Sequence, residues 1–140
     1  MNNLLITGAN GFFGNICTQY FTSKNFNVYG LIKKHGKFKF KPIIHDLSTE
    51  NSFTFPSEID FCIHAAGISP NLDWTIGDYL LNNSLSTLNL LKLLNKTKCK
   101  KIVYISAVSI YGEINSDTID EKTPIINPSS YGLSKYFSEK

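Results

Sequence analysis

Residues 7–14 read Thr7-Gly8-Ala9-Asn10-Gly11-Phe12-Phe13-Gly14, and this stretch decides the fold. The run Leu4–Ile6 before it is short and apolar, which predicts a buried strand. The segment Gly11–Ser23 carries apolar residues at helical spacing, which predicts a helix. The glycines therefore fall in a turn that leads from a strand into a helix.

The three glycines have separate physical uses in such a turn. Gly8 permits a tight turn, and Gly11 lets backbone N–H groups approach a diphosphate at the positive end of the new helix. Gly14 lets the helix pack closely on the strand. The spacing is G-x-x-G-x-x-G, not the G-x-G-x-x-G of the commonest dinucleotide fold. The alternative interpretation is an ordinary glycine turn before a helix.

Composition narrows the class of protein. A chain of 140 residues is enough for one domain with a real core, and a net charge of +3 does not by itself argue for nucleic acid or membrane. Cys17, Cys62 and Cys99 form no C-x-x-C pair, so neither a disulfide framework nor a metal site is indicated. We expect reduced thiols in a cytoplasmic protein without a signal peptide or membrane span.

Short apolar runs alternate with helical patterns along the rest of the chain. This alternation predicts an α/β fold with a doubly wound parallel sheet. We expect the sheet to be Rossmann-like, with strand order 3-2-1-4-5. The expected strands are Leu4–Ile6, Asn27–Ile32, Pro42–His45, Ile59–His64 and Lys101–Ser106. The expected helices are Gly11–Ser23, about Asp73–Leu94 and one beginning at Ser129, with a short helix or turn in Ser48–Ser57.

Two features of the later helices stand out. The segment Asp73–Leu94 carries leucines that step by three and four residues and form one helical stripe. The stripe consists of Leu81, Leu85, Leu88, Leu91 and Leu94. Ser129–Lys140 begins a helix without a stop signal before the chain ends. We therefore expect residues 1–140 to be an incomplete dinucleotide-binding domain, truncated before a C-terminal substrate domain.

Several motifs fall in a specific order. They are Thr7–Gly14, Asp46-Leu47, His64–Gly67, Asn82-Asn83 with Thr87, Ser106–Gly112, Glu121 with Thr123-Pro124, and Tyr131–Lys135. In this order the chain resembles the N-terminal part of the extended short-chain dehydrogenase/reductases, the NAD-dependent epimerase/dehydratase family that acts on nucleotide sugars. The resemblance covers essentially all of the sequence.

The resemblance implies a role for each matched position. Contacts to the cofactor diphosphate are implied for Gly8, Asn10, Gly11, Phe12, Phe13 and Gly14. Asp46 and Leu47 border the adenine, and Ala65, Ala66 and Gly67 line the cofactor. Asn83 matches a structural asparagine, while Tyr131 and Lys135 match the catalytic Y-x-x-x-K pair. The family also implies a homodimer formed through helices on one side of the sheet.

Tyr131 and Lys135 lie four residues apart on a helix and therefore project on the same side. A nearby ammonium and a positive nicotinamide favour the phenolate and lower its pKa. Tyr131 is then able to take a proton from a sugar hydroxyl while hydride leaves for the nicotinamide. The alternative is a surface tyrosine and lysine on an amphipathic helix.

One position departs from the family pattern. The family has Ser or Thr five residues before the glycine of its Tyr-Gly pair, and here that residue is Ala107. We expect Ser106 or Ser109 to supply the hydroxyl that orients the substrate, or activity to be impaired. Neighbouring residues of a strand point to opposite faces. Ser106 can therefore place its hydroxyl where the family has one at position 107 only through a local bulge.

The second strand ends in Lys33-Lys34 and carries no carboxylate. An acid there marks NAD, whereas a basic residue accommodates the 2′-phosphate of NADP. We favour NADP over NAD, with solvated loop charges as the alternative. The run Lys37–Lys41 interleaves lysine and phenylalanine, but its place between two strands argues for a protected sheet edge rather than nucleic-acid binding.

We therefore expect an NAD(P)-dependent oxidoreductase domain of the epimerase/dehydratase type, with Tyr131 as acid and base. Its expected partner is a small nucleotide-sugar substrate, with no nucleic acid and no membrane. The alternative is a dinucleotide-binding remnant without turnover, which Ala107 and the abrupt end of the chain favour.

Overall fold

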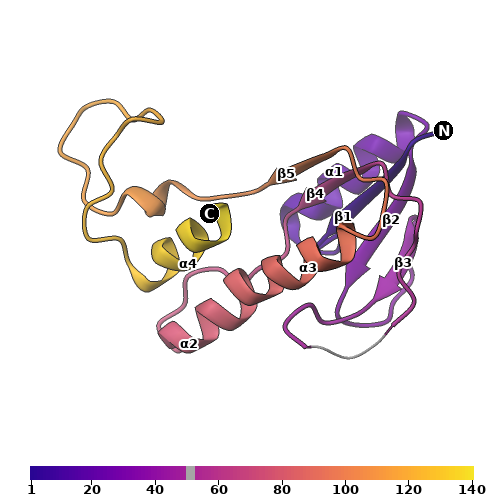
Figure 1. Cartoon of the computed structure of the whole chain (residues 1–140), viewed down its shortest axis with the longest axis horizontal. Helices are drawn as coiled ribbons and strands as arrows, with labels where there is room; N and C mark the ends of the chain where they lie inside the picture. The colour runs from indigo at the N-terminus through magenta and orange to yellow at the C-terminus, as the bar shows by residue number, and fades with distance from the viewer. Residues whose placement is uncertain (50–52) are drawn as a thin grey trace.

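The computed structural model describes residues 1–49 and 53–140 and contains one parallel sheet (Figure 1). Its strands are β1 (Asn3–Thr7), β2 (Asn27–Ile32), β3 (Lys41–Ile44), β4 (Phe61–His64) and β5 (Lys101–Tyr104). Their order in the sheet is β3-β2-β1-β4-β5, so the predicted fold class and strand order are confirmed. Part of the predicted short helix or turn, residues 50–52, lies outside the described residues.

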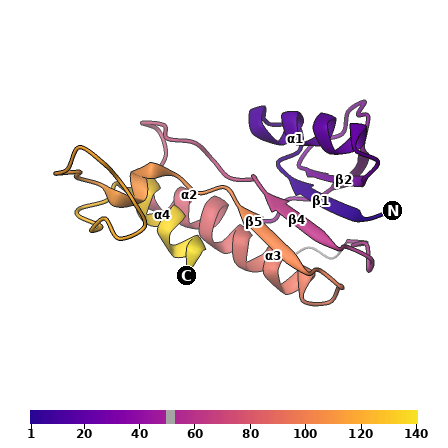
Figure 2. The ribbon, with the colours of Figure 1, turned by 90° about the horizontal axis from the view of Figure 1, so that it is seen from above.

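Helices lie on both faces of the sheet. Figure 2 shows α1 (Phe12–Ser23) on one face and a long helical rod on the other. The rod is α2 (Ile76–Tyr79), a π-helical segment η1 (Leu80–Leu85) and α3 (Ser86–Leu94) in direct succession. The last helix, α4 (Ser130–Glu139), packs against α2 and η1. Within the described residues no helix is both long and apolar enough to cross a bilayer.

The core has two parts because successive side chains of a strand point to opposite faces. Leu5 on β1 belongs to the cluster on the side of the rod, where it joins Leu90 and Leu94. Leu4 and Ile6 belong to the cluster on the side of α1. All three β1 residues are essentially inaccessible, as expected for a central strand covered on both faces.

The register of the sheet sets three strand ends in one row. Thr7 of β1 pairs with His64 of β4, and His64 pairs with Tyr104 of β5. The segments that follow these residues, beginning at Gly8, Ala65 and Ile105, therefore leave the sheet at the same carboxyl edge. Neighbouring strands lie about 4.8 Å apart, so the ends of β1 and β5 are separated by about 10 Å. This edge is where open parallel sheets bind ligands.

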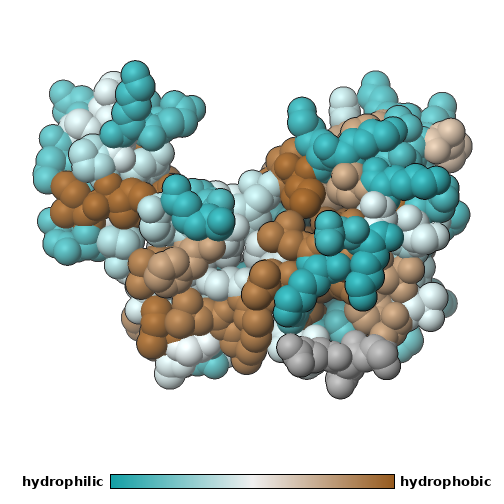
Figure 3. Space-filling view, viewed as in Figure 1, coloured by the Kyte–Doolittle hydropathy of each residue, from teal (hydrophilic) through white to brown (hydrophobic). Residues whose placement is uncertain are grey.

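The leucine stripe of the rod faces outward. Leu81, Leu85, Leu88 and Leu91 are each 37–48% exposed, and only Leu94 of the predicted stripe is buried. Figure 3 shows apolar surface gathered where α2 and α3 lie. The face turned toward the protein is largely polar instead. Its buried polar residues are Asn83, Ser86, Thr87 and Asn89. Asn83, Thr87 and Asn89 form hydrogen bonds with other parts of the chain, and the Ser86 hydroxyl donates to Asn82 O within the rod. A polar helix face can therefore be buried here.

Candidate active site

The turn after β1 is built as the glycines predicted. Gly8 has φ +63°, and a Cβ there would lie 2.9 Å from backbone atoms of Ala65 and Ala66. Gly8 N–H donates to Leu31 O, which ties the turn to β2. Helix α1 begins at Phe12 with Gly11 as its N-cap and no side-chain cap. The N–H groups of its first turn therefore lack intrahelical acceptors and are available to an anion.

A cavity of about 350 Å³ opens beside this turn, at the ends of β1, β2 and β4. Most of the residues expected to hold a cofactor line it. These are Gly8, Asn10, Gly11, Lys33, Lys34, Asp46, Leu47, Ala65, Ala66 and Gly67. Phe12 and Phe13 are exposed beside it, and Gly14 is buried against the carbonyl group of Gly8. We call this cavity the corner pocket.

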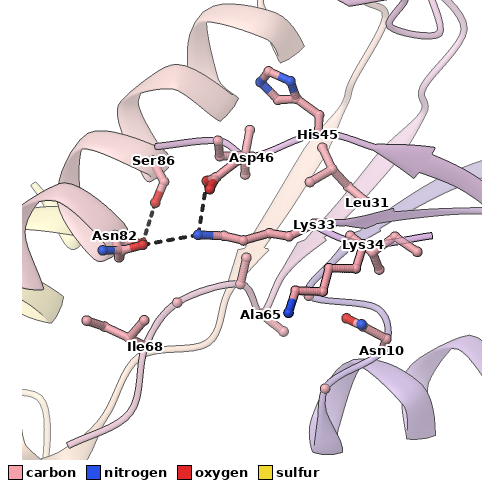
Figure 4. A pocket seen from close by; sticks show the side chains of 16 residues that line it. Asn10, Leu31, Lys33, Lys34, His45, Asp46, Ala65, Ile68, Asn82 and Ser86 are labelled. Atoms are coloured by element: carbon pink, nitrogen blue, oxygen red, sulfur yellow. Dashed lines mark hydrogen bonds and ion pairs between the residues drawn. The ribbon is translucent and has the colours of Figure 1, made fainter. Parts of the chain in front are cut away.

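One side chain crosses the corner pocket (Figure 4). Lys33 Nζ lies 3.0 Å from Asp46 Oδ1 and donates to Asn82 Oδ1 at 3.1 Å. Asp46 Oδ1 also accepts from Ser48 N–H at 2.9 Å and from the Ser48 hydroxyl at 2.7 Å. Burial raises the pKa of Asp46, but the Ser48 hydrogen bonds and the Lys33 ammonium outweigh it, and the net pKa is lowered. The carboxylate is therefore held ionised.

Asn83 connects the loop after β4 to the last helix. Its Oδ1 accepts from Ile68 N–H at 2.8 Å, and its Nδ2 donates to Ser134 Oγ on α4 at 2.9 Å. A Cβ on Gly67 would lie 2.8 Å from Asn83 Oδ1. Asn83 is thus buried behind the pocket wall rather than in it, and it fixes two segments that border the site.

A buried hydrogen-bond chain runs behind the strand ends. Ala66 N–H donates to Thr7 Oγ1 at 3.0 Å, and Thr7 Oγ1 lies 2.6 Å from His64 Nδ1. His64 Nε2 lies 2.9 Å from Thr87 Oγ1, which itself donates to Asn83 O at 2.6 Å. Because the Thr87 proton is used, His64 Nε2 must donate, and Thr7 donates to Nδ1. We call this sequence of bonds the His64 chain.

The His64 chain requires a neutral imidazole. Burial, together with the Lys135 ammonium, lowers the pKa of His64 from 6.5 to about 4. The ring is 1% exposed and lies 5.4 Å from the Tyr104 ring, centroid to centroid. His64 therefore has a structural place next to the site and is not free to transfer protons at neutral pH.

Helix α4 brings Tyr131 and Lys135 to the same sheet edge. Ser129 caps the helix by accepting from Gly132 N–H. Lys135 Nζ donates to Ile105 O at 2.6 Å and lies 4.3 Å from the centroid of the Tyr104 ring, directly at the end of β5. Burial lowers the pKa of Lys135 to about 8. The lysine is 6% exposed and still mostly protonated at neutral pH.

Tyr131 is partly exposed and lies edge-on to Tyr79, with 5.8 Å between ring centroids. Burial and the neighbouring Tyr79 raise the pKa of Tyr131 in the protein alone. The sequence predicted a lowered value from the Lys135 ammonium and a positive nicotinamide together. Here the Lys135 ammonium donates to a backbone carbonyl, so the protein by itself does not produce the lowering.

The stretch after β5 differs from the expected strand. The strand ends at Tyr104, and a 3₁₀ turn, η2 (Val108–Tyr111), follows with Ala107 as its N-cap. Ser106 thus lies outside the strand, and strict alternation does not fix its direction. Its hydroxyl oxygen is buried and has no hydrogen-bond partner within the described residues. Ser109 lies on η2, whose backbone packs against Gly132 of α4.

The sequence analysis quoted Asn82 and Thr87 among the matched motifs but assigned them no role in the site. Asn82 accepts the Lys33 hydrogen bond, and Thr87 accepts from His64 in the His64 chain. A signal was present, since two adjacent asparagines and a threonine interrupt an otherwise leucine-rich helix. π-helical segments such as η1, which carries both asparagines, are frequent at functional sites.

Comparison with known proteins identifies relatives over nearly the whole chain. A family model described as "NAD dependent epimerase/dehydratase family" matches residues 4–140. A putative UDP-glucose 4-epimerase of Methanocaldococcus jannaschii is 29% identical, over 98% of this chain and 48% of that protein. A dTDP-D-glucose 4,6-dehydratase of Dictyostelium discoideum is 30% identical, over 93% of this chain and 34% of that protein.

A solved structure gives the same likeness in three dimensions. The UDP-glucose 4-epimerase from Bifidobacterium longum, in complex with NAD+ and UDP, matches with a TM-score of 0.80 and 26% identity. The match covers 99% of this chain and 47% of that one. The chain thus spans about half the length of these epimerases or less.

Proposed function

Because the chain belongs to the NAD dependent epimerase/dehydratase family, we propose that it is the dinucleotide-binding part of an oxidoreductase that acts on a nucleotide-linked sugar. One observation supports this proposal above the others. The corner pocket and the Tyr131/Lys135 pair lie at one sheet edge, because Thr7, His64 and Tyr104 are in register.

The corner pocket fits the diphosphate and adenine ends of such a cofactor. Gly8 and Gly11 leave no side chain where the backbone meets the pocket, and the first turn of α1 presents N–H groups. Asp46 and Leu47 border the position proposed for adenine, with Ala65, Ala66 and Gly67 opposite. A bound nicotinamide supplies the hydride acceptor and donor. NAD+ in the Bifidobacterium enzyme supports a nicotinamide dinucleotide as the class of ligand.

Tyr131 and Lys135 have distinct roles in this proposal. Tyr131 exchanges a proton with a sugar hydroxyl through its phenolic oxygen. Lys135 is positively charged at neutral pH. Burial and Tyr79 raise the pKa of Tyr131 in the protein alone, so formation of the phenolate depends on the positive nicotinamide of the bound cofactor acting together with the Lys135 ammonium. Ser106 supplies the hydroxyl that orients the substrate. Its oxygen is buried and has no hydrogen-bond partner in the part of the chain that the structure describes, which supports this assignment.

A dinucleotide-binding protein without turnover is the second candidate. Ala107 favours it, because the family carries a hydroxyl at this position and Ala107 only caps the 3₁₀ turn here. The two candidates predict the same cofactor affinity and differ in catalysis.

NADP is the proposed form of the cofactor. The segment after β2 carries Lys33 and Lys34 at the corner pocket and no acid that would bind a ribose 2′-hydroxyl. Titration with NADPH and NADH by calorimetry tests this choice. Tighter binding of NADPH supports it, equal binding of both removes the preference, and binding of neither contradicts the proposed function.

Tyr131→Phe tests the catalytic proposal. In a full-length version that includes a substrate-binding part, with UDP-glucose or dTDP-glucose as substrate, the variant is expected to lose turnover and to keep its affinity for the dinucleotide. Tyr136→Phe, on the same helix, is the matched control and should keep both. If that full-length version without the substitution binds the dinucleotide but turns over neither sugar, the result favours the non-catalytic candidate.

We also propose a homodimer through the exposed leucine stripe. Leucines at three- and four-residue steps suit packing against a second helix, and one stripe on each copy is self-complementary. Leu85→Lys is expected to shift sedimentation toward the monomer. Leu72→Lys, in a fully exposed loop position, serves as the control. A monomeric wild-type chain would exclude this contact.

A further inference from the structure

Adjacent residues Lys33 and Lys34 leave the end of β2 in different directions. In Figure 4 the Lys33 side chain runs across the corner pocket to Asp46 and Asn82, whereas the Lys34 side chain runs toward Asn10. Among the described residues that line this pocket, these two carry a positive charge at neutral pH. We infer that they act differently: Lys34 reads the 2′-phosphate of NADP, and Lys33 holds the pocket together. This inference rests on the proposed function.

The charge of Lys33 is already matched. Its ammonium lies 3.0 Å from Asp46 Oδ1 and 3.1 Å from Asn82 Oδ1. A phosphate placed against Lys33 would therefore also face the Asp46 carboxylate, and the repulsion would cancel much of the attraction. Such a pair offers a dianion little net charge to bind.

Both partners of Lys33 are themselves held in place. Asp46 accepts two hydrogen bonds from Ser48, and Asn82 Nδ2 donates to Asp78 O at 3.0 Å. The backbone carbonyl oxygen of Asn82 accepts from the Ser86 hydroxyl one turn later in the rod. A single exposed ion pair is weak, but here one ammonium joins two acceptors that separate elements keep in position. Lys33 thereby connects the segments after β2 and β3 with η1.

Lys34 has the opposite character. Both lysines are exposed, but of the two only Lys33 has an ion pair among the described residues. Lys34 lines the corner pocket and lies on the side of the glycine turn. The N–H groups of the α1 first turn and the Lys34 ammonium together give this side of the pocket a positive potential. A second phosphate close to the ribose meets unmatched positive charge there. The difference in charge environment between the two lysines follows from the contacts of Lys33 with Asp46 and Asn82. It cannot be seen in the sequence, where the two adjacent residues are identical.

Matched neutral variants separate the two roles. We expect Lys34→Met to weaken NADPH binding about tenfold and to leave NADH binding within about twofold, because one charge-assisted contact is lost. Lys33→Met should weaken both dinucleotides by the same small factor and keep their ratio. Calorimetric titration with 2′,5′-ADP and with 5′-ADP repeats the comparison without the nicotinamide half. Thermal melts check that each variant is folded.

Asp46→Asn supplies an independent test. Removing the carboxylate frees the Lys33 charge, so the preference for 2′,5′-ADP over 5′-ADP should rise about threefold. The rise should vanish in the double variant Asp46→Asn with Lys33→Met. The inference is overturned if Lys33→Met loses NADPH selectively to the same extent as Lys34→Met, or if Asp46→Asn leaves the preference unchanged. Binding of neither dinucleotide by the wild-type chain overturns the proposed function itself, and this inference with it.

Discussion

Acidification from pH 7 to pH 4 is expected to destabilise the fold by about 3 kcal/mol through one buried side chain, His64. The pKa of this ring falls from 6.5 to about 4 on folding, because burial disfavours the imidazolium. Each pKa unit corresponds to about 1.4 kcal/mol. The unfolded chain binds the proton below pH 6.5, whereas the folded chain does so only near pH 4. Protons therefore favour unfolding throughout this window.

The predicted curve has a defined shape. The His64 contribution is fully present above pH 6.5, falls by about 2 kcal/mol at pH 5 and by about 3 kcal/mol at pH 4, and levels off below about pH 3. Urea unfolding at pH 7, 6, 5 and 4 measures it. The carboxylates of Asp46, Asp60 and Asp78 have lowered pKa values and lose their own contributions mainly below pH 4. Between pH 5 and pH 7 the change in unfolding free energy therefore reports the protonation of histidine rather than of these carboxylates.

His64→Gln removes the titrating group and keeps a donor and an acceptor for the two threonines. Its unfolding free energy should change little between pH 7 and pH 5. His45 is the matched control, because its pKa is also lowered by burial but the residue lines the corner pocket, with its ring stacked on Phe53, and takes no part in the His64 chain. His45→Asn should keep most of the wild-type slope. Equal slopes for wild type and His64→Gln, or a His64 ring that titrates near pH 6.5 by NMR, would refute the reasoning.

Three further predictions concern buried contacts and can be checked by urea unfolding. Thr87→Val leaves the His64 N–H without an acceptor and should lower the free energy of unfolding by about 1–3 kcal/mol. Thr87→Ser keeps the hydrogen bond and should have a smaller effect. Equal losses of stability in the two variants would contradict the His64 chain. Gly8→Ala should cost about 1–3 kcal/mol because of its positive φ and the contact with Ala65, whereas Gly77→Ala, with ordinary space for a methyl group, should cost nothing. Lys135→Met should stabilise the chain by about 1–2 kcal/mol at pH 7, because it removes a buried charge. This gain in stability should shrink between pH 8 and pH 10.5, as the wild-type lysine becomes neutral in the folded chain. A gain that does not depend on pH would exclude the buried charge as its cause.

Strand identity and order followed from the sequence, but strand ends did not. Ile59 is fully buried and was predicted to begin the fourth strand, yet β4 begins at Phe61. An apolar residue indicates that the position is buried, not that its backbone pairs with a neighbouring strand. The apolar run therefore extends beyond the residues that form the sheet. The same reason explains β5, which ends at Tyr104, level with the end of β4 at His64, although the apolar run continues to Ile105.

The helical rod shows a second respect in which the sequence pattern does not determine the structure. Leucine spacing correctly predicted a helix, but it marked the face that points away from the core. Periodicity identifies a face that needs a partner and does not say which partner. The inward face holds Asn83, Thr87 and Asn89, whose hydrogen bonds go to α4, His64 and Leu47 O. Hydrogen-bond partners so distant in sequence leave no periodic signal.

Contacts between residues distant in sequence were also the part of the site that the sequence did not predict, whereas its local parts were predictable. The glycine turn is local, so its residues and their spacing carried the prediction. The Lys33–Asn82 contact joins residues 49 positions apart, and the Thr7–His64 contact joins residues 57 apart. Sheet register, which the sequence does not specify by itself, decides that these side chains meet. The chemistry of the pocket therefore depends on pairs rather than on single residues, and two adjacent lysines can differ in charge environment although the sequence makes them equal.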